Sequence, residues 1–182
     1  MTQVRVIDAA DVSPDLLETL RELCDDAFED GGEGGFSDDD WAHAVGGRHV
    51  VAFSGPEVVA HAALVTRDLW VDGVLQPTGY VEAVATEPSL QGQGLGTLVM
   101  EAVGALITAD GVLGALSTGA PEFYQRLGWE LWRGPTYVRR GDDLVRTPDE
   151  DDAVMVLRPG AALQRLDLGA AIACCERAGD DW

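Results

Sequence analysis

Residues 80–97 of the chain read YVEAVATEPSLQGQGLGT, a sequence that indicates a strand, a glycine-rich loop and the start of a helix. Its first seven residues (80–86) are apolar or β-branched apart from Glu82, which is typical of a largely buried strand. Glycines then recur at alternate positions in residues 91–96, and a helical pattern follows from Thr97 to about Ala109. A strand, a glycine-rich loop and a helix in this order favour binding of an anionic phosphate. Glycine lets backbone N–H groups approach the ligand, and the helix N-terminus adds partial positive charge.

The same loop excludes two common phosphate-binding motifs. It lacks the Gly-Lys-Ser/Thr of a P-loop, and its glycine spacing is not the G-x-G-x-x-G of a dinucleotide fold. Without a lysine, no side-chain charge would reach a transferring γ-phosphate, so phosphoryl transfer is not expected. On the residues alone, an ordinary flexible turn stays an alternative.

The flanking sequence predicts an α/β domain on a mixed sheet, because hairpin connections alternate with helical crossovers. Asp72-Gly73 is a hairpin turn signal, Ser13-Pro14 is a helix start, and Ser37 to Asp40 form an S-x-x-D capping box. The glycines of residues 31–35 should separate two helices, and residues 146–152 should form an acidic loop. Strands are expected at 4–7, 49–54, 58–70, 75–86, 112–117, 129–138 and 154–157, and helices at about 14–23, from 37 past Trp41, 97–109 and 121–127.

Composition and charge narrow the range of functions. The chain has 182 residues, of which 46% are hydrophobic, and this suits one domain with a sizeable core. The 12 Lys+Arg against 32 Asp+Glu leave a formal charge of −20, and the pI is near 4.2. Phosphate contacts need a basic surface, so neither nucleic acid nor an anionic membrane is an expected partner. The charge suits a cationic small molecule, although solubility alone also favours a high net charge.

The cysteines, the histidines and the N-terminus indicate a cytoplasmic protein without a structural metal. The three cysteines are Cys24, Cys174 and Cys175, no CxxC pair occurs, and the three histidines lack metal-ligand spacing. We therefore interpret the cysteines as small buried side chains in a reducing compartment. No charged-then-apolar leader follows Met1, and no apolar run has transmembrane length.

Two motifs resemble those of the GNAT N-acetyltransferases. The spacing Q-x-x-G-x-G from Gln91 to Gly96 resembles their pyrophosphate loop, and Tyr124-x-x-x-Gly128-Trp129 resembles their Y-x-x-x-G-[FW]. The resemblance implies the GNAT acetyltransferase fold, a mixed central sheet flanked by helices, as a single domain over residues 1–182. It also implies an enzyme with acetyl-CoA as co-substrate and no metal. The residues that would bind acetyl-CoA are Val84, Ala85, Thr86, Gln91, Gly92, Gln93, Gly94, Leu95, Gly96 and Thr97.

Further motifs resemble one branch of that superfamily, the aminoglycoside 2'-N-acetyltransferases. They are Asp40-Trp41-x-His43, Ala60-His61-Ala62-Ala63, Trp132-Arg133-Gly134-Pro135-Thr136 and Arg177-Ala178-Gly179-Asp180-x-Trp182. The resemblance implies acetyl transfer to the 2'-amino group of aminoglycosides, and hence antibiotic resistance, by direct attack in a ternary complex. Members of the superfamily commonly form dimers, so a homodimer is compatible with it, although no interface can be assigned from the sequence.

The resemblance also assigns roles to two side chains. Glu82 would be a base that removes a proton from the substrate ammonium through water, and Tyr124 would be the acid that protonates the coenzyme A sulfur. The residues alone leave alternatives open. Glu82 could be an edge-strand charge that faces solvent, and Tyr124 could be a helix aromatic packed on the core.

A polycationic substrate needs several converging carboxylates, because each exposed ion pair contributes only about 0–1 kcal/mol. Asp40 would also cap a helix whatever else it does, and Glu150 replaces an aspartate expected from the resemblance. The substrate-binding residues that the resemblance implies are Asp40, Glu82, Ala83, Ser117, Glu150, Asp151, Asp180 and Trp182.

Two other functions stay open. The first is a GNAT enzyme that acetylates another polyamine or an amino sugar, which would accept a hexosamine but no aminoglycoside. The second is a non-catalytic protein that binds cationic drugs, which would bind the drug tightly but not acetyl-CoA. No cysteine lies in a motif that would make it a nucleophile.

Overall fold

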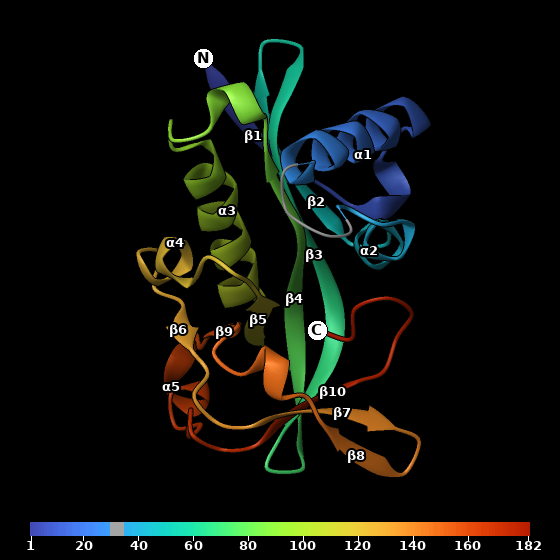
Figure 1. Ribbon diagram of the computed structural model, residues 1–182. Coiled ribbons are helices and arrows are strands. Elements are labelled where there is room, and N and C mark those ends of the chain that lie inside the picture. Colours follow the sequence, from blue (N-terminus) through green and yellow to red (C-terminus); the bar gives the residue numbers. More distant parts are fainter. Residues whose placement is uncertain (30–34) are drawn as a thin grey trace. The chain divides into compact units, whose positions relative to one another are not determined.

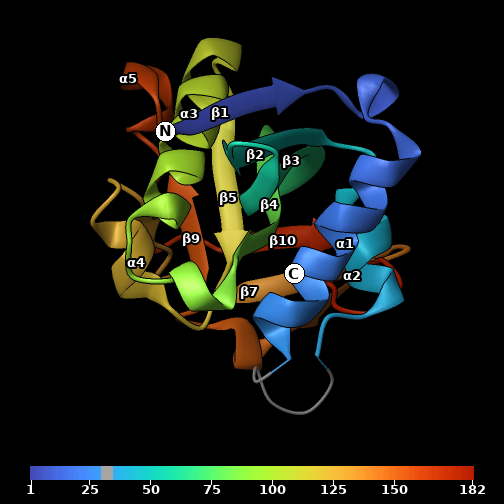
Figure 2. The ribbon, with the colours of Figure 1, turned by 90° about the horizontal axis from the view of Figure 1, so that it is seen from above.

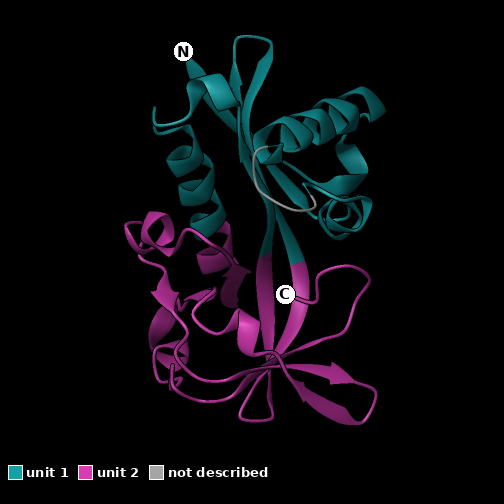
Figure 3. Ribbon diagram, viewed as in Figure 1, with its two compact units in different colours: residues 1–65, 81–105 teal, residues 66–80, 106–182 magenta. Residues whose placement is uncertain are grey.

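The computed structural model describes residues 1–29 and 35–182 and divides the chain into two units (Figure 3). Unit 1 comprises residues 1–65 and 81–105, and unit 2 comprises residues 66–80 and 106–182. Three elements contribute residues to both units. They are β3 (Glu57–Val71), β4 (Val74–Thr86) and α3 (Leu95–Asp110). A single domain over the whole chain stays a prediction.

Unit 1 is a layer of strands covered by helices on both faces. β1 (Thr2–Ile7) pairs antiparallel with β2 (Arg48–Ser54), β2 pairs antiparallel with β3, and β4 is the next neighbour of β3. Helices α1 (Pro14–Phe28) and α2 (Asp38–Ala44) lie side by side on one face, and the first part of α3 lies on the other (Figures 1 and 2). The short helices of this unit are η1 (Ala9–Asp11) and η2 (Pro88–Leu90).

The two predicted helix starts in unit 1 are confirmed. Ser13 caps α1, since its side chain accepts a hydrogen bond from the Leu16 N–H at 3.3 Å, and Pro14 occupies the first turn. Ser37 and Asp40 form both bonds of a capping box at the start of α2. The predicted break at residues 31–35 lies, apart from Gly35, outside the described residues.

Unit 2 contains a mixed sheet in the order β6-β9-β5-β4-β3-β10-β7-β8. The β5 strand is parallel to β4 and antiparallel to β9, whereas β10 is parallel to β7 and antiparallel to β3. This mixture confirms the predicted α/β class. The remaining elements are β5 (Leu113–Ser117), α4 (Pro121–Gln125), β6 (Glu130–Leu131), β7 (Thr136–Arg140), β8 (Asp143–Arg146), η3 (Pro148–Glu150), β9 (Val154–Leu157), α5 (Gly160–Leu163) and β10 (Ile172–Cys175).

The predicted strand 129–138 is wrong as a single element, because it is divided into β6 and β7. The division falls at Gly134, where a side chain would collide with the carbonyl oxygen of Ala170. The indole N–H of Trp132 donates to the same oxygen at 2.9 Å, so two segments far apart in sequence are held together here. Neither β8 nor β10 was predicted. All four residues of β8 are exposed, and β10 is only four residues long, so neither shows clear alternation.

The predicted turn at Asp72-Gly73 is confirmed. Both residues have positive φ angles, 47° and 75°, which are the angles a type I′ hairpin requires. Among the described residues, no helix is both long enough and apolar enough to cross a membrane.

Candidate active site

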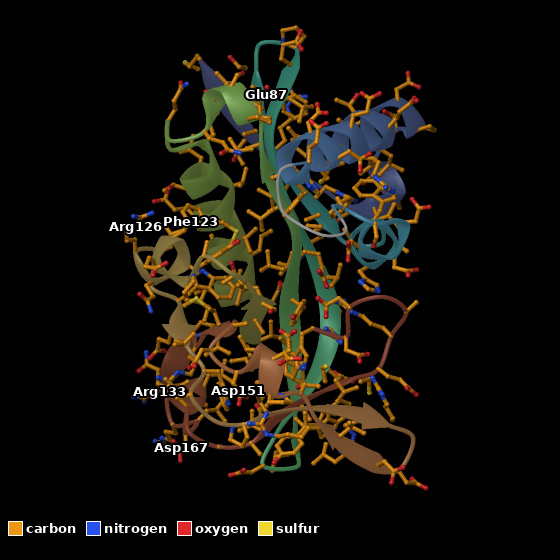
Figure 4. All side chains as sticks on the ribbon, in the orientation of Figure 1. Glu87, Phe123, Arg126, Arg133, Asp151 and Asp167 are labelled. Carbon is orange, nitrogen blue, oxygen red and sulfur yellow. The ribbon has the colours of Figure 1, made fainter. Side chains whose placement is uncertain are left out.

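The glycine loop of unit 1 opens with a capped turn and ends at a helix N-terminus. Glu87, labelled in Figure 4, caps η2 by accepting from the N–H and the hydroxyl of Ser89, at 3.4 and 3.0 Å. Gly92 and Gly94 have φ angles of 75° and 84°. A side chain at either glycine would meet nothing within 4 Å, so the loop needs glycine for its backbone conformation and not for space.

The helix that follows offers donors to an anion. The Leu98 N–H makes a hydrogen bond of 3.1 Å with the Gly94 carbonyl, so the N–H groups of residues 95–97 precede the first bond of this helix. Residues 91–94 are exposed. Exposed N–H groups, left-handed glycines and the positive end of the 16-residue α3 fit a pyrophosphate.

The strand before this loop is irregular next to its carboxylate. Glu82 is half-buried in β4, and the following Ala83 has a φ angle of 51°, a left-handed conformation that is rare for a residue with a side chain. The Ala83 carbonyl oxygen lies 2.9 Å from Nδ1 of the buried His61. Further along β4, Ala85 packs with Leu23 and Cys24 of α1, so the strand is anchored on the helix layer.

Asp40 lies in unit 1 as well, and one oxygen of its carboxylate is already used. Oδ2 accepts from the Ser37 N–H at 2.9 Å and from the Ser37 hydroxyl at 2.8 Å. The side chain therefore fulfils the capping role that its position in the sequence predicts. It stays a predicted substrate ligand through its other oxygen.

In unit 2, a pocket of about 320 Å³ lies between η3 and the segment that follows β10. We call it the acidic pocket. Its lining carries more carboxylates than cations. It is formed by Arg146, Thr147, Pro148, Asp149, Glu150, Gly179, Asp180, Asp181 and Trp182.

Glu150 is a half-buried carboxylate of the acidic pocket. Burial raises the pKa of Glu150 above its ordinary value, and the charges of Asp180 and Asp149 raise it further. A hydrogen bond of 2.9 Å from the Ser117 hydroxyl to Oε2 acts in the opposite direction on this pKa. A half-buried carboxylate beside two like charges is stabilised by a cationic ligand, because the ligand replaces lost solvation and relieves the repulsion.

Asp151, labelled in Figure 4, is engaged in a different way. Its carboxylate forms a bidentate pair with the Arg146 guanidinium and accepts from the backbone N–H and hydroxyl of Thr136, at 3.2 and 3.0 Å. The hydrogen bond from Arg146 is the main reason that the pKa of Asp151 lies below its ordinary value. The side chain does not line the acidic pocket, and it holds the acidic loop against β7.

The end of the chain is fixed in place by contacts that the sequence did not reveal. Arg177 donates to the carbonyl oxygens of Asp180 and Trp182, at 2.7 and 2.8 Å. Arg67 donates to the carbonyl oxygen of Asp181, and Arg140 pairs with its carboxylate at 3.0 Å. The Trp182 side chain is only 4% exposed.

The Trp182 indole joins this segment to the acidic loop. Its N–H lies 3.2 Å from the Thr147 hydroxyl, and the backbone N–H of Trp182 donates to Asp180 Oδ1 at 3.0 Å. Ser117, Glu150, Asp180 and Trp182 therefore all lie at or against the acidic pocket, and the first two are hydrogen-bonded. Arg67 and Arg140 could not be found from sequence, because their partners are over 40 residues away.

Tyr124 lies in α4 of unit 2 and is 8% exposed. Burial raises the pKa of Tyr124 to about 12, and a hydrogen bond with Thr118 opposes this shift. The Y-x-x-x-G-[FW] motif that contains Tyr124 has a structural basis. The Tyr124 carbonyl oxygen accepts a hydrogen bond from the Trp129 N–H at 3.2 Å, and Gly128 between them ends the turn with a φ of 86°. The Tyr124 and Trp129 rings then pack edge to face.

Comparison with known proteins identifies the family. Residues 9–132 match the acetyltransferase (GNAT) domain. The chain belongs to the GNAT acetyltransferase family, whose fold is a curled mixed sheet flanked by helices.

Among its relatives is the aminoglycoside 2'-N-acetyltransferase of Mycolicibacterium fortuitum. The two are 40% identical over 181 residues, which cover 98% of this chain and 91% of the relative.

Solved structures of the family share the fold. A GNAT family N-acetyltransferase (YhbS) from Escherichia coli, in complex with CoA, superposes with a TM-score of 0.65 at 18% identity and covers 95% of this chain and 89% of its own. A GNAT family acetyltransferase from Brucella melitensis, in complex with acetyl-CoA, has a TM-score of 0.55 at 18% identity. It covers 71% of this chain and 83% of its own.

Proposed function

We propose that the protein transfers the acetyl group of acetyl-CoA to the 2'-amino group of an aminoglycoside. The observation that carries the proposal is the acidic pocket, in which the half-buried Glu150 lies among further carboxylates. Arg146, the cation that lines this pocket, is already paired with Asp151, so the lining keeps a net negative charge. A polycationic sugar supplies the complementary charges, and the name of the Mycolicibacterium fortuitum relative supports this substrate class.

We propose a direct transfer in a ternary complex. The substrate ammonium first loses a proton, through water, to Glu82. The neutral amine attacks the thioester carbonyl carbon, which forms the C–N bond, and the C–S bond then breaks. Tyr124 gives its hydroxyl proton to the departing sulfur. The attacking nitrogen loses its second proton as the amide forms, and this proton restores the Tyr124 hydroxyl through water, while Glu82 releases its own proton to solvent. The resemblance implies that a backbone N–H of β4 near Val84 donates to the carbonyl oxygen as negative charge develops there. We take the N–H of Val84 itself, which follows the left-handed Ala83.

The charge of the chain also favours encounter with such a substrate. A formal charge of −20 attracts a polycation over distances beyond direct contact. This attraction weakens as salt is added, because the screening length falls to about 8 Å at physiological ionic strength. The resemblance carries two further proposals, a homodimer and a role in antibiotic resistance. The composition carries two more, a cytoplasmic location and the absence of a nucleic-acid or membrane partner.

Removing the charge of Glu150 should raise KM for the aminoglycoside. We expect Glu150→Gln to raise it about tenfold, because a partly desolvated ion pair contributes more than an exposed one. The Ser117 contact survives in the amide, so kcat should change little. Steady-state kinetics with the exposed Asp142→Asn as the control, which makes the same charge change outside the acidic pocket, would measure the effect. Equal KM values for the two variants would remove Glu150 from the substrate site.

The raised pKa of Glu150 also predicts a pH effect. Its carboxyl takes up a proton at a higher pH than an ordinary glutamate does, so substrate affinity should fall earlier on acidification in the unmodified protein than in Glu150→Gln.

Substituting Gly94 should weaken binding of acetyl-CoA. Alanine at a φ of 84° costs about 1 kcal/mol, and relief of this strain would move the N–H groups of the loop. We therefore expect Gly94→Ala to raise Kd for acetyl-CoA about fivefold by calorimetry. Gly111→Ala is the matched control, since Gly111 has a φ of 67°, open surroundings and a place outside the loop. The same Kd in both variants would argue against the loop as the coenzyme site.

The experiment that tests the function itself is release of free thiol from acetyl-CoA in the presence of an aminoglycoside panel. The panel pairs drugs that bear a 2'-amine with counterparts that bear a 2'-hydroxyl. Release with the 2'-amino members alone supports both the reaction and its position. Release with both sets keeps the acetyltransferase and rejects the position. No release, with acetyl-CoA still bound, would favour the alternative of another polyamine or an amino sugar. Tight drug binding without acetyl-CoA binding would favour a non-catalytic drug-binding protein.

A further inference from the structure

Two histidines face each other in the interior of unit 1. His49 lies on β2 and His61 on the neighbouring β3, and both side chains are completely buried. Strand pairing places His49 opposite Ala63 and His61 opposite Val51, so the two residues are diagonal neighbours. Their rings stack with centroids 5.2 Å apart. The proposed reaction has no role for either of them.

The two rings form a chain of three polar contacts between two backbone carbonyls. Nδ1 of His61 lies 2.9 Å from the Ala83 carbonyl oxygen. Nε2 of His61 lies 2.9 Å from Nδ1 of His49. Nε2 of His49 lies 3.2 Å from the carbonyl oxygen of Val45, at the end of α2. All three distances are hydrogen-bond distances.

The number of protons does not match the number of contacts. A carbonyl oxygen only accepts, so each of the three contacts needs one N–H. Two neutral imidazoles carry one N–H each, and only a charged pair carries three. Burial lowers the pKa of His61 to about 3, with a further contribution from His49, and burial also lowers the pKa of His49. At neutral pH the pair is therefore neutral, and one contact lacks a proton.

The distances indicate which contact lacks it. The contact with Val45 is the longest of the three, which favours placing the two protons in the His61–Ala83 and His49–His61 contacts. Both rings then carry their proton on Nδ1. Cys24 also lies at this site, with its sulfur 3.9 Å from His61 Nδ1, and burial raises its pKa to about 12, so it stays a neutral thiol. In this arrangement His49 donates to Nε2 of His61 and so fixes its tautomer.

The acceptor of the His61 proton belongs to a peptide group that matters for the reaction. The Ala83 carbonyl and the Val84 N–H are the two ends of one planar trans peptide, so they point in opposite directions. A donor on the carbonyl holds that plane in a fixed orientation. It also polarises the N–H at the other end, because hydrogen bonds in a chain strengthen one another. The left-handed Ala83 needs such support, since this conformation costs about 1–3 kcal/mol.

We propose that His61, held in its Nδ1–H tautomer by His49, is a positioning residue that aims and polarises the Val84 N–H toward the thioester oxygen. The inference rests on the proposed function, because it takes the Val84 N–H as the donor to that oxygen. The chain of hydrogen bonds runs from His49 to His61, from His61 to the Ala83–Val84 peptide group, and from that group to the acetyl group of the bound coenzyme.

The tautomers can be measured on the unmodified protein without coenzyme. Long-range proton–nitrogen correlation spectra of protein labelled with nitrogen-15 distinguish Nδ1–H, Nε2–H and charged imidazole. At neutral pH we expect both His49 and His61 as Nδ1–H. A His61 that carries its proton on Nε2, or that is charged, would overturn the proposal. This measurement needs no variant and no turnover.

Two variants test the consequence for the coenzyme. His61→Leu removes the donor and keeps a buried apolar side chain, whereas in His61→Asn the amide nitrogen occupies nearly the place of Nδ1 and can restore the donor. In the unmodified protein, infrared spectra of bound acetyl-CoA should show a thioester carbonyl stretch below its solution frequency. The stretch should return toward the solution value in His61→Leu and shift down again in His61→Asn. The same frequency in all three proteins would contradict the proposal.

The kinetic expectation separates positioning from a merely structural role. His61→Leu should lower kcat about tenfold, which is less than the loss on removing an oxyanion donor outright, and should leave the acceptor KM unchanged. His61→Asn should recover most of the loss. A variant with raised KM and unchanged kcat would show a structural role only.

If no aminoglycoside is acetylated while the tautomers and the carbonyl shift are as stated, the proposed function fails and this inference stands. If His61→Leu does not fold, the tautomer spectra decide.

Discussion

Glu82→Gln is expected to lower kcat for acetyl transfer at neutral pH by about 10²–10³-fold. The amide keeps the size of the side chain but cannot accept the ammonium proton through water. Because Glu82 lies in β4 before the glycine loop, binding of acetyl-CoA by residues 91–97 should be unchanged. Steady-state kinetics and calorimetry with acetyl-CoA would measure the two effects separately.

The dependence of the Glu82→Gln rate on pH is a second test of Glu82 as the base. With Gln at position 82, the rate should rise with pH as the substrate amine loses its proton to solvent, and the deficit should shrink. Glu57→Gln is the matched control, because Glu57 is exposed at the start of β3 in the same unit. An unchanged rate in Glu82→Gln would remove this residue from catalysis.

Tyr124→Phe should lower kcat by about 10²-fold, because the departing sulfur loses its proton donor. Burial raises the pKa of Tyr124 to about 12, so the phenol keeps its proton throughout the neutral range and is lost as a donor only as pH rises through that value. The substitution removes one oxygen and its hydrogen bond with Thr118, which costs stability of only about 1 kcal/mol. Rapid-quench measurement of the acetylated product would report the chemical step.

Tyr137→Phe is the control for this substitution, since Tyr137 lies on β7 in the same unit and loses the same atom. Its kcat should equal that of the unmodified protein. If Tyr124→Phe also keeps the full rate, water is the acid and Tyr124 is a core aromatic.

Local sequence signals predicted the parts of the fold that depend on a few neighbouring residues. The cap at Ser13, the capping box at Ser37 and the turn at Asp72 need particular side chains or φ angles within four residues of one another, and the structure contains all three. The glycine loop was predictable for the same reason. Gly92 and Gly94 have positive φ angles, which glycine adopts readily, so the residue type itself indicates the backbone conformation.

Features that depend on distant partners could not be predicted. Asp151 looked like any acid of the 146–152 loop, yet Arg146 and Thr136 engage it, whereas its neighbour Glu150 lines the acidic pocket. The anchor of the C-terminal segment on Arg67 joins residues more than 100 positions apart. Periodicity carries no information on such pairs.

The contact between His49 and His61 could not be predicted from the sequence either. Each histidine stands in a continuous run of buried, mostly apolar strand residues, and nothing in the sequence indicates that their rings meet. The contact appears only when the register of β2 and β3 is known.

The left-handed backbone at Ala83 restricts how this position can vary in evolution. Glycine adopts such a φ without strain, asparagine and aspartate tolerate it, and β-branched or bulky side chains do not. Alanine is therefore close to the largest apolar residue that the position accepts. If Glu82 is the base, as proposed, a change of acyl donor or acceptor would have to come from residues other than Ala83, because this position accepts few larger side chains.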